Sequence, residues 1–270
     1  MTTNNPLSED QQLETAELKD FRNGVVDWIK HNTPADPGFL LPQTFMEVGS
    51  EQVLDFLREW QYKVWSTGYL GMAWPKEYGG GGMPRIFQQI ADEEMKRARV
   101  PICFNIIGLG WAGPLIIDTG TDFEKETYLK GILTGEDIWC QGFSEPDHGS
   151  DLGNAQTRAV RDGDDYIING SKMFISGAGE TELLVVMCRT GEAGPKGISA
   201  IAIPADAAGV TYGKAEDKMG WNAQPTRLIS FENVRVPVTN LLGEEGQGFT
   251  FAMKGLDGGR INIATCSIGT

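Results

Sequence analysis

The chain has 270 residues, a formal net charge of -14 at pH 7 and 40% hydrophobic residues, with seven tryptophans among them. Its length predicts about two domains, and its apolar content is enough to build sizeable cores. The acidic balance argues against a general nucleic-acid binder and against a polybasic membrane contact, because both need a basic face. It leaves room for a phosphate-bearing ligand, since local backbone N–H groups can bind one against an acidic background.

Metal- and thiol-based classes are also disfavoured. The four cysteines are scattered without a C-x-x-C pattern and the chain has two histidines, so neither a zinc site nor a disulfide framework is expected. The start of the sequence, MTTNNPLSEDQQ, is polar and acidic, which does not fit a signal peptide and makes a reducing cytoplasm the simplest location. The uncharged stretch at 100–117 carries two prolines, three glycines and an asparagine. These breakers favour a buried helix and loop over a membrane span.

The first half of the chain predicts amphipathic helices. Apolar residues recur at helical spacing on two faces, formed by Phe21, Val25, Trp28 and Ile29 and by Val53, Leu57, Trp60 and Val64. A third helix is expected to begin at Pro84, and another at Thr121, which forms a capping-box pattern with Glu124. The glycines of WPKEYGGGGMP, at 74–84, suggest a phosphate loop, but no G-K-[S/T] follows. A flexible turn between helices is therefore the favoured interpretation.

From about Trp139 the pattern changes to short β-branched runs separated by turn residues, which predicts a β domain. The runs are YIINGSKMFIS, ELLVVMCRT, GISAIAIPA and RLISFENVRVP. Two turn signals interrupt them, DGDD at 162–165 and NG at 169–170, and the second predicts a tight hairpin. After Pro237 a glycine-rich segment leads into 251–270, where a helical pattern returns.

Two serines, a histidine and several carboxylates crowd into GFSEPDHGSDLGNAQTRA, at 142–159. A hydrolase triad is disfavoured, because neither Ser144 nor Ser150 is bracketed by glycines as a nucleophile elbow requires. As a loop, with Pro146 to fix a turn and Gly149 to let backbone approach a ligand, the stretch offers N–H and O–H donors to a phosphate or a heterocycle. From the spacing alone a polar surface turn is the simpler interpretation.

Three segments occur in order along the chain: FSEPDHGSDLGNAQTRAVRDGDDYIINGSKMFISGAGE, MGWNAQPTRLISFENVRVP and GEEGQGF. Together with WPKEYGG they closely resemble the acyl-CoA dehydrogenase family, in family order and over most of the chain. The resemblance implies an α+β multidomain fold. An N-terminal all-α domain (1–138) would precede a middle antiparallel β domain (139–243) and the start of a C-terminal four-helix bundle (244–270), with FAD and an acyl-CoA meeting between them.

The resemblance implies cofactor contacts for the loop. Ser144 would hydrogen-bond the flavin ring through its backbone and hydroxyl, and Ser150 would help hold the FAD pyrophosphate. Phe143 and Gly149 would shape the same loop. His148 is less usual at its position, and a solvated loop residue is favoured over a cation beside the pyrophosphate, because a lone histidine has no fixed charge at neutral pH.

Further contacts are implied on the strands beside the loop. Phe174 stands where the family commonly has a tryptophan packed on the flavin, and Ser176 where a threonine or serine contacts the redox nitrogen. Gln141 occupies a position often filled by an aromatic residue. The alternatives are that Phe174 is an ordinary core residue and Ser176 a strand-end hydroxyl.

The implied reaction removes an α proton from the thioester by a glutamate while the β hydrogen leaves as hydride to the flavin, giving a 2-enoyl-CoA. Ser150, Asp257 and Arg260 match substrate-binding positions, the last two on the CoA arm; as an exposed helix face Asp257 and Arg260 would need no such role. Where a family subgroup has its glutamate before the arginine, this chain has Gly259. No catalytic base is identified within 1–270, so these residues alone are expected to be an inactive fragment.

The resemblance gives conflicting signals about the acyl group. From Ile175 onward the chain resembles isobutyryl-CoA and short branched-chain dehydrogenases, whereas the first half resembles bacterial enzymes that act on longer or bulkier acyl-CoAs. A short branched-chain acyl-CoA is the favoured substrate, which would place the enzyme in fatty acid or branched-chain amino acid breakdown. Implied partners are the acyl-CoA, an electron-transfer flavoprotein as acceptor and a further copy in a homodimer or homotetramer. The alternatives are a flavin oxidase or monooxygenase on this fold and a non-catalytic flavin- or CoA-binding remnant.

Overall fold

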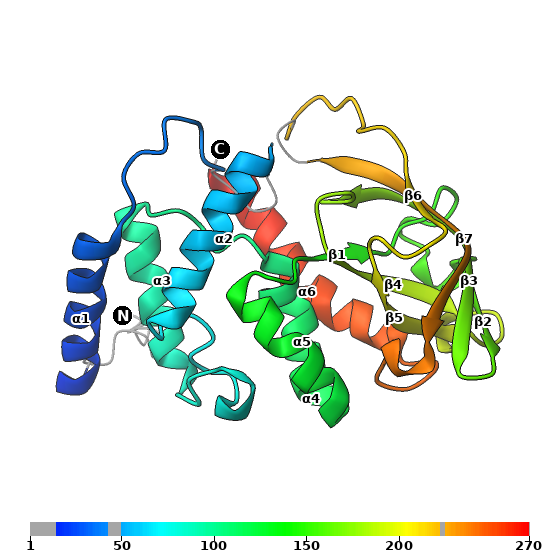
Figure 1. The fold of residues 1–270 in the computed structure, drawn as a ribbon, viewed down its shortest axis with the longest axis horizontal. Coiled ribbons are helices and arrows are strands. Elements are labelled where there is room, and N and C mark those ends of the chain that lie inside the picture. The colour runs from blue at the N-terminus through cyan, green and yellow to red at the C-terminus, as the bar shows by residue number, and fades with distance from the viewer. Residues whose placement is uncertain (1–14, 43–49, 222–224, 270) are drawn as a thin grey trace, which may run out of the picture.

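The computed structural model describes residues 15–42, 50–221 and 225–269. Helices form one side of the molecule and a β-sheet the other, with helices near the middle of the chain and at its end lying between them (Figure 1). The helices of the first half are α1 (Ala16–Asn32), α2 (Glu51–Ser66), α3 (Arg85–Ala98), α4 (Gly113–Thr119) and α5 (Asp122–Thr134). The last helix, α6 (Gly248–Gly269), follows the sheet and packs on it.

The predicted helical faces are confirmed. On α1 the side chains of Val25 and Ile29 are buried, and on α2 the whole predicted face is buried. The predicted start at Thr121 is also correct, because Thr121 and Glu124 form a reciprocal capping box at the beginning of α5. Pro84 is the residue before α3 and so marks its beginning. Local spacing and capping chemistry therefore place these helices.

The glycine-rich stretch at 74–84 connects α2 to α3, as predicted. It contains a short 3-10 turn, η2 (Lys76–Tyr78), and returns along the preceding segment through backbone bonds such as Met83 N–H to the Met72 oxygen at 2.7 Å. A Cβ at Gly80 would lie 2.3 Å from the Trp74 carbonyl oxygen. The glycine is needed for this close backbone approach, which is a reason independent of any phosphate.

The uncharged stretch at 100–117 is helix and loop, as predicted, and it is buried or half-buried except at Gly110. It contains a π-helical turn, η3 (Gly108–Ala112), which continues into α4. Across the residues that the structure describes, no helix combines the length and the apolarity that crossing a membrane would need.

The second half forms one mainly antiparallel sheet in the described residues, with the order β6-β7-β3-β2-β4-β5-β8 and β1 paired in parallel with β4. Its strands are β1 (Trp139–Gly142), β2 (Arg158–Asp162), β3 (Asp165–Ser176), β4 (Leu183–Arg189), β5 (Ile198–Pro204), β6 (Val210–Tyr212), β7 (Thr226–Pro237) and β8 (Leu241–Leu242). Strand β4 is buried throughout, and its residues alternate between two cores. One core faces α4, α5 and α6, and the other faces β3 and β7, so β4 anchors the sheet to the helices.

One of the two turn predictions is right and the other is wrong. The DGDD signal makes the β2–β3 hairpin, in which Asp162 pairs with Asp165. The NG signal makes no turn, because Asn169 and Gly170 lie inside β3. Gly170 has a φ of 144°, and a Cβ there would lie 2.6 Å from the Thr157 Cα. Thr157 directly precedes β2, which pairs with β3, so the glycine allows a close approach of the paired strands, and this pairing overrides the local preference for a turn at NG.

Gly170→Ala is expected to destabilise the fold. The backbone conformation alone costs about 1–3 kcal/mol for a residue with a Cβ, and the contact with Thr157 adds to it. Urea unfolding followed by circular dichroism measures the loss. Gly110→Ala is the matched control, because its Cβ would meet nothing within 4 Å. Equal stability of the two variants would contradict this account of Gly170.

Candidate functional site

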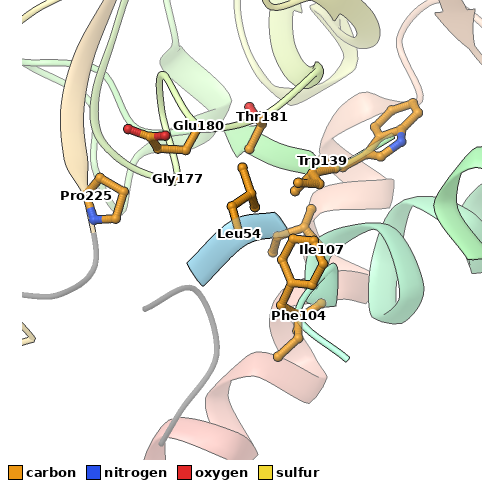
Figure 2. A pocket seen from close by; sticks show the side chains of 10 residues that line it. Leu54, Phe104, Ile107, Trp139, Gly177, Glu180, Thr181 and Pro225 are labelled. Atoms are coloured by element: carbon orange, nitrogen blue, oxygen red, sulfur yellow. The ribbon is translucent and has the colours of Figure 1, made fainter. Parts of the chain in front are cut away.

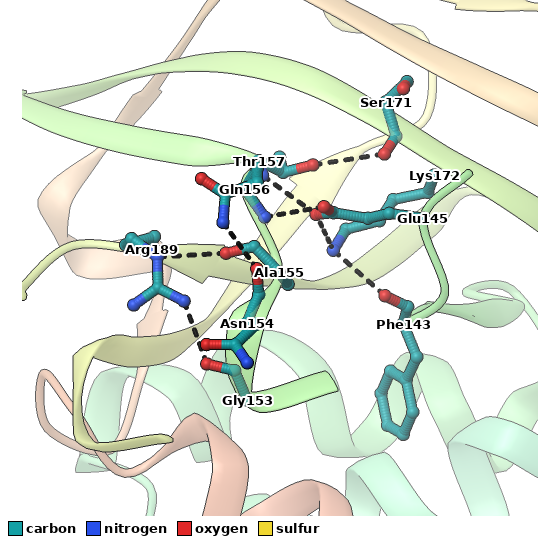
Figure 3. Close-up of polar contacts among 10 residues, drawn as sticks. All are labelled: Phe143, Glu145, Gly153, Asn154, Ala155, Gln156, Thr157, Ser171, Lys172 and Arg189. Carbon is teal, nitrogen blue, oxygen red and sulfur yellow. Dashed lines mark hydrogen bonds and ion pairs between the residues drawn. The ribbon is translucent and has the colours of Figure 1, made fainter. Parts of the chain in front are cut away.

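A buried ion pair ties together the two ends of the predicted loop (Figure 3). The Glu145 carboxylate accepts hydrogen bonds from the backbone N–H groups of Gln156, at 2.6 Å, and Thr157, at 2.8 Å. It also binds the Lys172 ammonium at 2.8 Å, and Lys172 donates a further bond to the Phe143 carbonyl oxygen at 3.1 Å. The Glu145 carboxylate therefore connects the two ends of the segment 143–157, which begins just after β1 and ends just before β2.

Both members of this pair are out of contact with water, with side-chain exposures of 0% for Lys172 and 4% for Glu145. Burial on its own raises the pKa of Glu145. The Lys172 ammonium and the hydrogen bonds from Gln156 and Thr157 outweigh burial, so the pKa of Glu145 lies below its ordinary value. The carboxylate is therefore ionised at neutral pH, where it serves as the fixed acceptor of the loop.

Ser144 is brought against the far end of β3. Its carbonyl oxygen accepts the Met173 N–H at 2.8 Å. Its own N–H and hydroxyl have no hydrogen-bond partner among the described residues, and the residue is half-buried. Ser144 thus has two unused donors beside Phe174, the residue that follows Met173 in β3.

That residue, Phe174, has a φ of 59° and a side chain that is 60% exposed. The alternative that it is an ordinary core residue is wrong. The register of β3 against β7 shifts between Lys172 and Ile175, and this irregularity turns the ring outward. A positive φ in a non-glycine residue is strained, and such strain gathers at binding sites. Two residues on, half-buried Ser176 pairs with Thr226 at the end of the strand.

Gln141 lies on β1, two residues before Phe143, where it pairs with Val185 and is half-buried. Phe143 is buried and packs edge-on against Trp111 of η3, with ring centroids 5.3 Å apart. Phe143 therefore fixes the start of the loop against the helical half, while Gln141 stays at the margin of the site.

The tip of the loop points to solvent. Glu145 and His148 close a turn through reciprocal backbone bonds of 3.0 and 3.2 Å, and Gly149 and Ser150 are exposed. A Cβ at Gly149 would meet nothing within 4 Å, and its φ lies outside the left-handed region. The fold itself therefore does not require glycine there, which fits a backbone that a ligand approaches closely.

Arg189 was not predicted from the sequence, but it holds the end of the loop at 153–155 in place. Its guanidinium is buried and donates to the carbonyl oxygens of Ala155, at 3.0 Å, and Gly153, at 2.9 Å (Figure 3). It also donates to carbonyls of the β4–β5 connection. The signal in the sequence was a single cation ending the apolar run LLVVMCR. Lys172 is likewise the one cation of β3.

Asp257 and Arg260 do not join the loop in the described residues. Both lie exposed on α6 and bind each other at 2.9 Å, one turn apart. Helix α6 packs on the sheet through Phe251 and Ala252, and the Trp111 indole N–H donates to the Phe251 carbonyl at 3.3 Å. The helix thus reaches the same tryptophan that Phe143 contacts.

A small, mostly apolar cavity lies where the helical half meets the sheet (Figure 2). Leu54, Phe104 and Ile107 line it from the helical half, and Gly177, Glu180 and Thr181 from the segment after β3. Its volume of about 20 Å³ is room for about one water molecule. It is too small for a flavin or an acyl chain, although it begins one residue beyond Ser176.

Two family models match the chain. One is described as acyl-CoA dehydrogenase, N-terminal domain, and matches residues 43–136; the other is acyl-CoA dehydrogenase, middle domain, and matches residues 140–234. The chain belongs to the acyl-CoA dehydrogenase family. The predicted N-terminal helices and the predicted mainly antiparallel sheet are both confirmed as parts of that fold.

Individual relatives agree. The chain is 44% identical over 215 residues to isobutyryl-CoA dehydrogenase, mitochondrial, of Dictyostelium discoideum, across 79% of this chain and 52% of that protein. It is 34% identical to probable acyl-CoA dehydrogenase YngJ of Bacillus subtilis, across 97% of this chain and 66% of that protein. A solved steroid ACAD, Tcur3481-Tcur3483, matches with a TM-score of 0.74 at 35% identity, across 93% of this chain and 63% of that one. The chain spans about half to two thirds of the length of these relatives.

Proposed function

We propose that these residues form the flavin-binding part of an FAD-dependent enzyme that oxidises an acyl-CoA thioester to the 2-enoyl-CoA. The observation that carries the proposal is the grouping of unused donors on Ser144 with the exposed ring of Phe174. An aromatic face beside an unpaired N–H and hydroxyl fits a flat heterocycle with polar edges. Family membership supports FAD as that heterocycle.

Each residue has a defined task in this proposal. Phe174 packs on the flavin, while Ser144 and Ser176 donate to its polar edge. Gly149 and Ser150, at the exposed tip of the loop, bind the pyrophosphate through backbone and hydroxyl donors. FAD, when bound, supplies the acceptor for the hydride that leaves the β carbon. The chain's own contribution is to hold these groups in a fixed geometry through Glu145.

For the substrate, we propose a short branched-chain acyl-CoA whose CoA arm contacts Ser150, Asp257 and Arg260. The name of the Dictyostelium relative supports isobutyryl-CoA, while the steroid ACAD makes a bulky acyl group the competing outcome. An electron-transfer flavoprotein as acceptor and a homodimer or homotetramer complete the proposal. Initial rates with isobutyryl-CoA against a bulky acyl-CoA distinguish the two substrate classes. Rapid reoxidation of the reduced flavin by oxygen would favour an oxidase instead.

Ser144→Ala combined with Ser176→Ala is expected to weaken FAD binding about 30-fold, because each lost hydrogen bond costs on the order of 1 kcal/mol. Titration of FAD, followed by its fluorescence, measures the dissociation constant in the longest natural form of the protein that contains residues 1–270. Ser171→Ala is the matched control, since its hydroxyl makes no hydrogen bond in the described residues. Unchanged FAD affinity in the double variant would overturn the assignment of these hydroxyls.

A further inference from the structure

The ammonium of Lys172 is shared between two acceptors. One is the Glu145 carboxylate, at 2.8 Å, and the other is the carbonyl oxygen of Phe143, at 3.1 Å. Lys172 is completely buried, so water does not screen either bond. A lysine needed merely to neutralise Glu145 would not have to touch the Phe143 carbonyl as well.

The Phe143 carbonyl and the Ser144 N–H belong to the same peptide group. A cation bonded to the oxygen of an amide draws electron density toward that oxygen and makes the amide N–H a stronger donor. The Ser144 N–H is one of the two unused donors of Ser144, with no partner among the described residues. The charge of Lys172 is therefore transmitted through one peptide to the group that faces the ligand.

Stability does not by itself account for this pair. Replacing a buried ion pair by apolar residues of similar volume is often neutral or stabilising, because desolvation of both charges offsets their attraction. Glu145 also accepts hydrogen bonds from two backbone N–H groups, of Gln156 and Thr157. The cation at this place is therefore better explained by what it does to the Phe143–Ser144 peptide.

We propose that Lys172 is a positioning residue that raises the reduction potential of the bound flavin, by polarising the Phe143–Ser144 peptide so that its N–H binds the reduced ring more strongly. Reduction adds negative charge to the flavin ring, and a stronger donor at its edge stabilises that charge. The inference rests on the proposed binding of FAD at Ser144. It adds a residue that touches neither the flavin nor the substrate.

The test is the flavin reduction potential of the FAD-loaded protein, in its longest natural form containing residues 1–270. Lys172→Met alone leaves the buried Glu145 carboxylate without its cation, so it is combined with Glu145→Gln. The amide oxygen of that glutamine can still accept a hydrogen bond from the backbone N–H groups of the loop. The potential of this double variant is expected to shift to a more negative value than that of the unaltered protein. Glu145→Gln alone keeps the Lys172 amine as a donor to the Phe143 carbonyl but removes the carboxylate that favours its charged form, so its potential should lie between those of the double variant and the unaltered protein.

Arg189→Met is the matched control for loosening of the loop. It removes the buried bonds to Gly153 and Ala155 but leaves the Phe143 carbonyl and Lys172 untouched. It should weaken FAD binding without moving the potential. The inference would be overturned if the double variant kept the unaltered potential. It would also be overturned if the double variant and Arg189→Met shifted the potential equally. If the unaltered protein binds no FAD, the proposed function itself fails, and this is seen before any variant is compared.

Discussion

Lys172→Met is expected to lower the free energy of unfolding by about 3–5 kcal/mol, the usual cost of leaving one member of a buried ion pair without its partner. The side chain of Glu145 is 4% exposed, so water cannot take the place of the lost ammonium. The two backbone N–H groups that bind the carboxylate remain but carry no full charge. Urea unfolding monitored by circular dichroism measures the loss.

Two further variants identify the cause. Adding Glu145→Gln to Lys172→Met removes the unpaired charge and should restore most of the lost stability. Arg235→Met removes an exposed cation paired with Asp162 and Asp165, and should cost much less, because water screens this ion pair. A loss for Lys172→Met as small as that for Arg235→Met would show that Glu145 finds another partner or takes up a proton.

The helices could be predicted because their signals are local. The buried faces of α1 and α2 follow from spacing, and the start of α5 follows from the Thr121 and Glu124 side chains. The NG signal was equally local but wrong, since Gly170 lies inside β3, where it closely approaches Thr157 beside the paired strand β2. Predictions therefore held where neighbours in sequence decide the structure, and failed where pairing with another strand decides it.

The candidate site divides in the same way. Resemblance of the loop motif placed Ser144 and Ser150, and the structure adds that Ser144 has unused donors and that Ser150 is exposed. The groups that hold the loop, Glu145, Lys172 and Arg189, were not predicted. A charged residue in an apolar run looks like a solvent-facing position of a strand, and its burial depends on carbonyls and carboxylates that the fold alone brings near.

A polypeptide of residues 1–270 with added FAD and an electron-accepting dye is expected to form no enoyl-CoA from isobutyryl-CoA or from longer acyl-CoAs. Removal of a weakly acidic α proton depends on a general base, which is typically worth about a hundred- to ten-thousandfold in rate. In the described residues Glu145 is bound by three donors, and Asp257 is exposed and paired with Arg260. Neither carboxylate is free to take the proton.

Gly259→Glu tests whether a general base is what limits this polypeptide. A Cβ at Gly259 would meet nothing within 4 Å, so the fold leaves space for a side chain directly before Arg260. If the absence of a base limits the rate, this variant should form enoyl-CoA where the unaltered polypeptide does not, with equal FAD binding in both. Turnover by the unaltered polypeptide would contradict the prediction. Glu180, which lines the cavity beside Gly177, is then the carboxylate to replace first, because Glu180→Gln would abolish that turnover if Glu180 were the base.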